Sequence, residues 1–253
     1  LWLAGLGGVQ THTPPDVWGR KWDTPSGGAG DARTVMEQVD AKLAETIDLG
    51  SRPSMAAETE ALRQRRKESA LRPEPQESYL AAVRAAVPED GILVSGMTQL
   101  GYYARAFWPT YEPRTFITSS YSGNLGYAYP TALGAKVAQP DRPVVALCGD
   151  GGFLFNSQEL ATAVQHGINA VAVVFNDNAY GNVLRDQVNQ FNGRAVGAEL
   201  HNPDFVKLAE AYGVRAARAE GPEALESALR EALAADAPSL IEVPVGMMPT
   251  PFT

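Results

Sequence analysis

The sequence has little sulfur, little imidazole and no excess of positive charge, and each shortage excludes a class of protein. Its one cysteine, Cys148, cannot form a disulfide within the chain. Its three histidines, His12, His166 and His201, are dispersed, so no cysteine and histidine cluster has the spacing of zinc ligands. The 21 basic residues are outnumbered by 29 acidic ones, and the net charge of −8 argues against a nucleic-acid-binding protein. We expect Cys148 in the core and the histidines in surface or capping positions.

Long apolar runs and a dinucleotide fingerprint are also missing. No apolar segment has the length of a transmembrane helix, and residues 1–9 lack the charge and length of a signal segment. With 45% hydrophobic and 20% charged residues, the composition is typical of a soluble enzyme, which we expect in the cytoplasm. The Gly-x-Gly sequences at 5–7 and 149–151 lack the third glycine of a dinucleotide-binding loop. This argues against a dinucleotide-dependent oxidoreductase.

From about residue 75 onward, apolar runs that suit buried strands alternate with segments that suit helices. The predicted strands are 92–95, 144–148, 170–175 and 239–244. The predicted helices are 76–86, 134–138, a helix from near Asn156 to Gly167, 203–212 with Asn202 as its N-cap, and 222–235. This alternation predicts an α/β fold, in which a parallel sheet is covered by helices on both faces.

Two of the predicted strands are followed by an aspartate. Asp150 comes two residues after the run at 144–148, and Asp177 comes two residues after the run at 170–175. A single strand-helix-strand crossover separates them, so both carboxylates are expected at the same edge of the sheet. Open α/β sheets bind their ligands at this edge.

The residues around these aspartates favour a metal and a diphosphate. Magnesium typically takes one or two carboxylates, together with carbonyl, water and phosphate oxygens, so Asp150 and Asp177 suit it better than zinc. Gly151 and Gly152 allow backbone amides to approach a diphosphate closely, and the helix that follows directs its positive end at the same anion. An isolated Gly-Asp-Gly is usually only a tight turn, but the pairing with a second aspartate one crossover away favours a binding site.

The same residues carry a resemblance to a known family. Gly149-Asp150-Gly151, followed by Asn176-Asp177, resembles the thiamine-diphosphate motif of the acetolactate synthase and benzoylformate decarboxylase superfamily. The resemblance covers about residues 75–247 and implies the thiamin diphosphate-binding fold of that superfamily's C-terminal domain.

The resemblance implies thiamine diphosphate and Mg²⁺ as cofactors. The side chains of Asp150 and Asp177 and the backbone carbonyl of Ala179 would bind the metal. Many members have asparagine at the position of Asp177, and the second carboxylate here raises the demand for a divalent cation beside the diphosphate. The cofactor-binding residues that the resemblance implies are Gln99, Gly123, Leu125, Gly149, Asp150, Gly151, Gly152, Asp177, Ala179, Tyr180 and Gly181.

The segment 119–134 is similar to the family's segment around the pyrimidine ring of the cofactor. Leu125 falls at the position of the bulky apolar wedge that holds the cofactor in its bent, reactive form, and backbone groups at Gly123 and Leu125 would bond the pyrimidine. Gln99, in the turn after the strand at 92–95, would touch the diphosphate. Taken alone, Leu125 would be a core leucine and Gln99 a solvated loop residue.

The resemblance leaves part of an active site outside this chain. Residues 1–50 are similar to the end of the family's middle domain, with the strands that should precede its last helix missing; 51–74 is a linker helix and 75–253 is the cofactor-binding domain. The glutamate that activates the cofactor belongs to a pyrimidine-binding domain that this sequence lacks. We therefore expect a fragment of a longer enzyme, or one chain of a split enzyme, that forms a homodimer or higher oligomer. No prediction is made about FAD, since the middle domain that would hold it is nearly all missing.

The activity implied by the resemblance is carbon-carbon bond making or breaking on a 2-keto acid such as pyruvate. Acetolactate-synthase-like carboligation is the first expectation, and 2-keto-acid decarboxylation or aldehyde ligation is the alternative. The residues expected to line the approach to the reactive carbon are Asn178, Tyr180, Asn182 and Val183. A non-catalytic cofactor-binding module is the alternative from another class; it would keep both aspartates and show no turnover.

Overall fold

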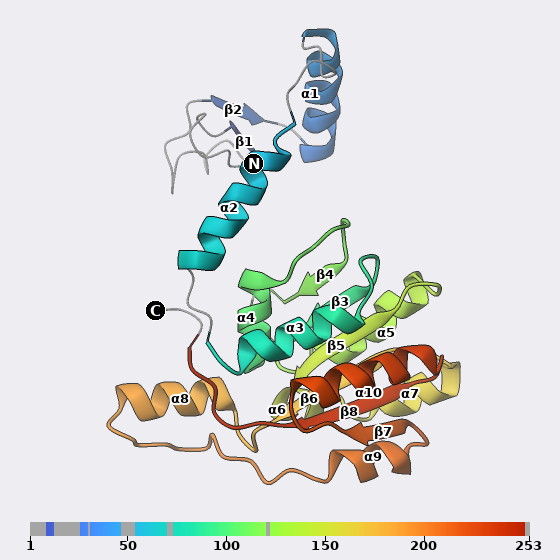
Figure 1. Cartoon of the computed structure of the whole chain (residues 1–253). Helices are drawn as coiled ribbons and strands as arrows, with labels where there is room; N and C mark the ends of the chain where they lie inside the picture. The colour runs from blue at the N-terminus through green and yellow to red at the C-terminus, as the bar shows by residue number, and fades with distance from the viewer. Residues whose placement is uncertain are drawn as a thin grey trace. The chain divides into compact units, whose positions relative to one another are not determined.

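The computed structural model describes residues 9–12, 26–29, 31–46, 54–69, 73–119 and 122–250. The chain divides into two compact units, residues 1–70 and 71–253 (Figure 1). All of the predicted site residues lie in the second unit. Each unit is described by itself below.

The first unit contains two short strands and two helices. They are β1 (Val9–His12), β2 (Ser26–Ala29), α1 (Ala32–Thr46) and α2 (Ala56–Ser69). The two strands pair in parallel, so the expectation that no strands precede α1 was wrong. The sequence did not indicate them because each has only four residues and β2, Ser-Gly-Gly-Ala, has no apolar alternation. The assignment of this unit to a middle domain stays a prediction.

The second unit is built on a six-stranded parallel sheet in the order β4-β3-β5-β6-β8-β7. Its strands are β3 (Ile92–Ser95), β4 (Phe116–Thr118), β5 (Val144–Gly149), β6 (Val171–Asn176), β7 (Arg215–Arg218) and β8 (Ser239–Pro244). The four predicted strands are the four inner ones. The edge strands β4 and β7 were not predicted. β4 has only three residues, and β7, Arg-Ala-Ala-Arg, has no apolar run.

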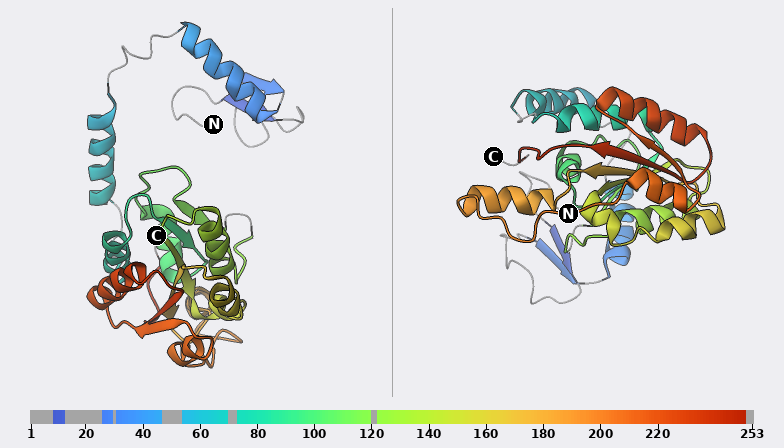
Figure 2. Two further views of the ribbon diagram at one scale, coloured as in Figure 1. Left: turned by 90° about the vertical axis from the view of Figure 1, so that its right-hand side faces the viewer. Right: turned by 90° about the horizontal axis from the view of Figure 1, so that it is seen from below.

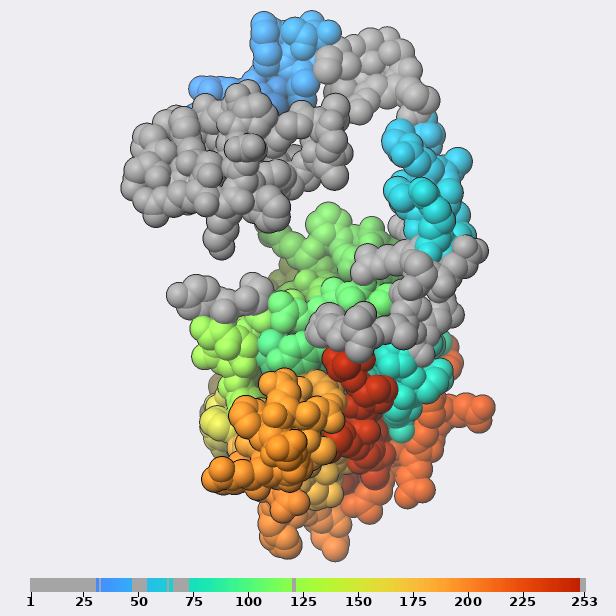
Figure 3. Space-filling view, turned by 90° about the vertical axis from the view of Figure 1, so that its left-hand side faces the viewer, coloured from blue at the N-terminus to red at the C-terminus, as the bar shows by residue number. Residues whose placement is uncertain are grey.

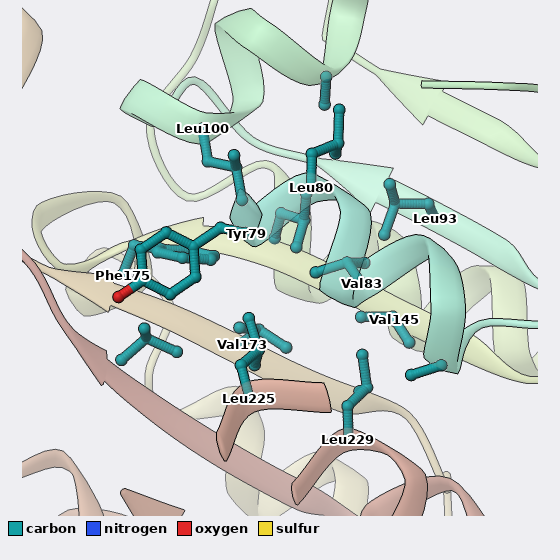
Figure 4. Close-up of a cluster of buried hydrophobic side chains, with 14 of the residues drawn as sticks. Tyr79, Leu80, Val83, Leu93, Leu100, Val145, Val173, Phe175, Leu225 and Leu229 are labelled. Atoms are coloured by element: carbon teal, nitrogen blue, oxygen red, sulfur yellow. The ribbon is translucent and has the colours of Figure 1, made fainter. Parts of the chain in front are cut away.

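Helices cover both faces of this sheet, which confirms the predicted α/β fold (Figure 2). One face carries α3 (Gln76–Ala86), α4 (Gln99–Phe107) and α10 (Pro222–Ala234), and the other carries α5 (Ala128–Ala138), α7 (Glu159–His166) and α9 (Phe205–Ala211). Strand residues alternate between the faces, as the period of two requires. Figure 4 shows the first core, in which Leu93, Val145 and Val173 of the strands meet Leu80, Val83, Leu225 and Leu229 of the helices.

Cys148 lies on β5 in the hydrophobic core between the sheet and helices α5, α7 and α9, as predicted. It is 3% exposed, and burial raises the pKa of its thiol to about 12, so it remains a protonated packing residue. His166 and His201 are exposed, as predicted, whereas the side chain of His12 lies outside the described residues. None of the helices in the described part of the chain has the length and apolarity needed to cross a bilayer.

Three predicted helix starts were wrong. The helix expected from Asn156 begins at Glu159, after a short helix α6 (Asp150–Leu154), and the Asn156 side chain donates to the Gly126 carbonyl. The N-cap of α9 is Asp204, which accepts from two backbone amides of the first turn, and not Asn202. The side chain of Asn202 instead donates to Asp150 and Asn176. Helix α5 also begins earlier than predicted, at Ala128.

Candidate functional site

The ends of β5 and β6 form the floor of the candidate site. Gly149 and Phe175 are partners across the two strands, so Asp150 and Asp177 follow at the same edge of the sheet, as predicted. A cavity of about 310 Å³ opens there. All eleven predicted cofactor-binding residues line it, together with Met97, Thr98, Tyr102, Phe175, Asn182, Val183, Val245 and Met248.

Asp150 is 2% exposed and held from three directions. Its Oδ1 accepts from the backbone amide of Gly151 at 2.8 Å, and its Oδ2 accepts from the backbone amide of Ala179 at 3.2 Å and from Asn202 Nδ2 at 2.6 Å. Burial raises the pKa of Asp150, while these hydrogen bonds oppose that rise by stabilising the carboxylate. The side chain is therefore fixed in one orientation.

Asp177 is half-buried beside Asp150, and its Oδ2 accepts from Gln99 Nε2 at 2.7 Å. Burial, and then the charge of Asp150, raise the pKa of Asp177 to about 7. Two carboxylates that disfavour each other's ionisation are stabilised by a proton or a cation between them. The described residues contain no group of three or more His, Cys, Asp and Glu that could hold a metal. Magnesium needs only one or two carboxylates and takes its other ligands from carbonyls, water or phosphate.

The loop after β6 is held in place by a segment that returns from α8 (Gly181–Gln190). The amide of Tyr180 donates to the carbonyl of Ala198 at 2.8 Å, and the amide of Leu200 donates to the carbonyl of Asn178 at 2.7 Å. Asn178 has a positive φ of 54°, which asparagine tolerates better than most residues. This pairing brings Asn202 to Asp150. Of the four residues predicted to line the approach, Tyr180, Asn182 and Val183 line the cavity and Asn178 is exposed beside it.

Glycines allow the close packing of these side chains. A Cβ at Gly181 would lie 2.0 Å from Asp177 Oδ2, and a Cβ at Gly151 would lie 2.5 Å from a ring carbon of Tyr180. Real side chains cannot occupy either place without displacing a wall of the cavity. The glycines of the motif are therefore required by the packing of the site as well as by any ligand.

Leu125 is 39% exposed and lines the cavity, so the alternative of a core leucine was wrong. A Cβ at Gly152 would meet the Leu125 side chain at an ordinary contact distance of 3.7 Å, which places that side chain over Gly152. An apolar side chain held partly in solvent at this position is consistent with a ligand packing against it. Its wedge role stays a prediction.

Gln99 is 5% exposed, so the alternative of a solvated loop glutamine was also wrong. Besides donating to Asp177, it accepts from the amide of Met248 at 2.7 Å. Arg185 of α8 donates to the Met248 carbonyl at 3.3 Å, and Figure 3 shows α8 beside the C-terminal segment. Gln99 therefore ties Asp177 to the segment after β8, and its predicted contact with a diphosphate remains a prediction.

The sequence reasoning missed several lining residues. Met97 and Thr98 follow β3 at the same edge of the sheet, so the rule that found the aspartates could have found them. Val245 and Met248 follow β8 and could have been found in the same way. Asn202 could not, because it reaches the site through a loop whose path no local pattern records.

The raised pKa of Asp177 predicts how the metal-free chain responds to pH. A carboxyl that is protonated more readily when folded contributes stability that is fully present below its unfolded pKa of about 4 and is lost as pH rises through its folded pKa. Since that folded pKa is about 7, we expect the melting temperature to fall between about pH 5 and about pH 7, relative to the Asp177→Asn variant. Thermal melts in chelator test this; a constant difference between the two proteins across that range would contradict it.

Comparison with known proteins identifies relatives of this chain. The model of the family "Thiamine pyrophosphate enzyme, C-terminal TPP binding domain" matches residues 96–243. A probable acetolactate synthase large subunit of Methanococcus aeolicus is 36% identical over 157 residues, which are 62% of this chain and 26% of that protein. A probable 2-ketoarginine decarboxylase of Pseudomonas aeruginosa is 33% identical over 218 residues, which are 85% of this chain and 38% of that protein.

A similar solved structure is the thiamine diphosphate-dependent 4-hydroxybenzoylformate decarboxylase of Rhodococcus jostii RHA1. It aligns with a TM-score of 0.61 at 36% identity, over 66% of this chain and 32% of that one. The chain thus spans between about a quarter and two fifths of the length of these relatives.

Proposed function

Because the chain belongs to the thiamine pyrophosphate enzyme family and carries its C-terminal cofactor-binding domain, we propose that it uses Mg²⁺ with thiamine diphosphate to make or break a carbon-carbon bond of a 2-keto acid. The observation that carries the proposal is the pair of carboxylates at the ends of β5 and β6, in which the buried Asp150 helps to raise the pKa of the half-buried Asp177. They lie in one cavity with the glycines that leave room for a diphosphate.

In this proposal the side chains of Asp150 and Asp177 and the carbonyl of Ala179 bind Mg²⁺, and the metal binds the diphosphate. A divalent cation removes the electrostatic cost of two ionised carboxylates side by side, so its binding strengthens as Asp177 loses its proton. The backbone at Gly151 and Gly152 supports the same diphosphate. Gln99 holds Asp177 in place by donating from its amide nitrogen to the Asp177 carboxylate.

When bound, thiamine diphosphate supplies a carbon nucleophile and an electron sink for carbon-carbon cleavage. The residues of this chain position it and keep water away. Leu125 would support the cofactor, while Phe175, Val245 and Met248 form an apolar wall of the cavity. This wall would keep water away from the reacting part of the cofactor.

The proposed active site is completed by a pyrimidine-binding domain that contributes a glutamate. That domain lies in a further segment of a longer protein or in a partner chain, within a homodimer or higher oligomer. Residues 1–50 are proposed as the end of a middle domain, 51–74 as a linker helix and 75–253 as the cofactor-binding domain.

Acetolactate-synthase-like carboligation is the first proposed reaction. The second candidate, 2-keto-acid decarboxylation, is favoured by one observation: the similarity to the 2-ketoarginine decarboxylase extends over 218 residues, against 157 for the acetolactate synthase. Product analysis of the complete enzyme with pyruvate and with longer 2-keto acids distinguishes them. Acetolactate supports carboligation, and an aldehyde with CO₂ supports decarboxylation. Cofactor binding without any turnover would identify a non-catalytic module and overturn the proposal.

Leu125→Ala is expected to leave cofactor affinity within about twofold and to lower kcat by at least about tenfold, because shortening the wedge relaxes the cofactor geometry without removing an anchor. Steady-state kinetics and cofactor titration of the complete enzyme measure both. The matched control is Val164→Ala, which shortens an exposed apolar side chain that lies on α7 and does not line the cavity. Full activity in Leu125→Ala would remove the wedge role.

A further inference from the structure

The side-chain amide of Asn202 connects Asp150 to a chain of hydrogen bonds that ends at the protein surface. Asn202 Nδ2 donates to Asp150 Oδ2 at 2.6 Å and to Asn176 Oδ1 at 2.9 Å. Asn176 Nδ2 donates to Glu242 Oε1 at 2.8 Å. Arg218 then donates to Glu242 Oε2 through Nε at 3.0 Å and through Nη2 at 2.9 Å. We call the four residues Asn202, Asn176, Glu242 and Arg218 the Asn202 relay.

The relay runs across neighbouring strands of the sheet. Arg218 on β7 is the register partner of Glu242 on β8, and Asn176 ends β6, which pairs with β8. Asp150 follows β5, which pairs with β6. The relay therefore joins the carboxyl-terminal parts of four strands and spans the distance from the sheet edge to the metal site.

Charged groups stand at both ends of the relay, Arg218 with Glu242 at one and Asp150 at the other, and together they fix the direction of its hydrogen bonds. A guanidinium only donates and a carboxylate only accepts, so Glu242 must accept from both Arg218 and Asn176. Asn176 therefore turns its NH₂ to Glu242 and its oxygen to Asn202. Asn202 in turn must direct its NH₂ at that oxygen and at Asp150. The two amides, whose oxygen and nitrogen have nearly the same shape, are oriented by these charged groups and by the backbone amide of Asn178, which donates to Asn176 Oδ1 at 3.2 Å.

The exposed fractions of Arg218 and Glu242 show that their ion pair is only partly at the surface. Glu242 is 4% exposed, whereas the side chain of Arg218 is 44% exposed. Exposed ion pairs contribute little to stability, but a buried carboxylate needs its partners. Here those partners are the guanidinium and the amide that leads to Asp150.

We propose that Asn202 is a positioning residue for the metal ligand Asp150, and that Arg218 and Glu242 act on it through Asn176. The inference rests on the proposed magnesium site. Holding Asp150 Oδ2 fixes the carboxylate rotation, so that the other oxygen presents a lone pair to the metal. Partners that orient a metal ligand in this way commonly change metal affinity by about 10- to 100-fold when removed.

The test is calorimetric titration of the 253-residue chain with Mg²⁺ in saturating thiamine diphosphate. Asn202→Ala is expected to weaken Mg²⁺ binding by about tenfold, and Glu242→Gln and Arg218→Gln by about threefold each. Arg218→Lys, which keeps the charge without the two-pronged contact, should recover part of the loss. Arg215→Gln, at the other end of β7 and outside the relay, is the matched control and should bind as wild type.

A double-mutant cycle separates the relay from a purely structural role. In the Asn202→Ala background the Glu242→Gln substitution should have no further effect on Mg²⁺ affinity, because its route to Asp150 is cut. Equal losses from Glu242→Gln in both backgrounds, or no loss in either, would overturn the inference. If Asn202→Ala does not fold, the test rests on the Arg218 variants and Glu242→Gln. Wild-type Mg²⁺ affinity in both Arg218→Gln and Glu242→Gln would then overturn the inference. Absence of Mg²⁺ binding by the wild type would overturn the proposed function, and the relay with it.

Discussion

Replacing Asp150 by alanine is expected to abolish magnesium-dependent binding of thiamine diphosphate. The carboxylate lies at the end of β5, is buried, and is held by three hydrogen bonds that leave it no alternative orientation. Its loss removes one of two protein carboxylates from the proposed metal site, and a loss of more than about 100-fold in cofactor affinity is expected. Calorimetry in magnesium measures it.

Two further variants make this result specific. Asp150→Ala also leaves the donors on Ala179 and Asn202 without their acceptor, whereas Asp150→Asn keeps an acceptor and nearly the same volume but removes the charge. Both are expected to lose magnesium-dependent binding. Asp186→Ala, which removes an exposed carboxylate on α8, is the control and should bind normally. Unchanged affinity in both Asp150 variants would refute the metal assignment.

Gly181→Ala is expected to reduce magnesium-dependent cofactor binding by at least about 30-fold, although it adds a single methyl group. That methyl would lie 2.0 Å from Asp177 Oδ2 and 2.7 Å from Gln99 Nε2, so the hydrogen bond between those side chains cannot remain where it is. Alanine is a better helix former than glycine, so the start of α8 gains no comparable defect. The effect should therefore appear in metal binding and not in helix content.

Gly134→Ala is the matched control, because nothing lies within 4 Å of the added Cβ on α5. Titration of both variants with Mg²⁺ and thiamine diphosphate, with circular dichroism as a check on folding, measures the difference. If Gly181→Ala binds as tightly as Gly134→Ala, the displaced Asp177 carboxylate is not needed by the metal. The proposed pair of metal ligands would then be wrong.

The part of the site that follows from strand order could be predicted from the sequence. Asp150 and Asp177 each follow an apolar run, and the right-handed crossover of parallel strands brings such positions to one edge of the sheet. The glycines beside them are recognisable because a close approach of backbone needs them. The four inner strands are also recognisable, since burial on both faces makes them largely apolar, although β8 contains the buried Glu242.

The parts that depend on distant side chains could not be predicted. Gln99 reaches Asp177 across 78 positions of sequence, and Asn202 reaches Asp150 across 52. Nothing local distinguishes such an amide from a solvated glutamine or a helix cap, as the mistaken capping role of Asn202 illustrates. Asp204, two residues later, has the same capping chemistry and accepts from two backbone amides of the first turn of α9.

The most direct test of the proposed site is calorimetric titration of this chain with thiamine diphosphate, once in magnesium and once in excess chelator. We expect saturable binding in magnesium and none in chelator, because the two carboxylates repel a diphosphate unless a cation lies between them. Binding of equal strength in both conditions would contradict the metal site, and no binding in either would contradict the proposed magnesium-dependent cofactor site.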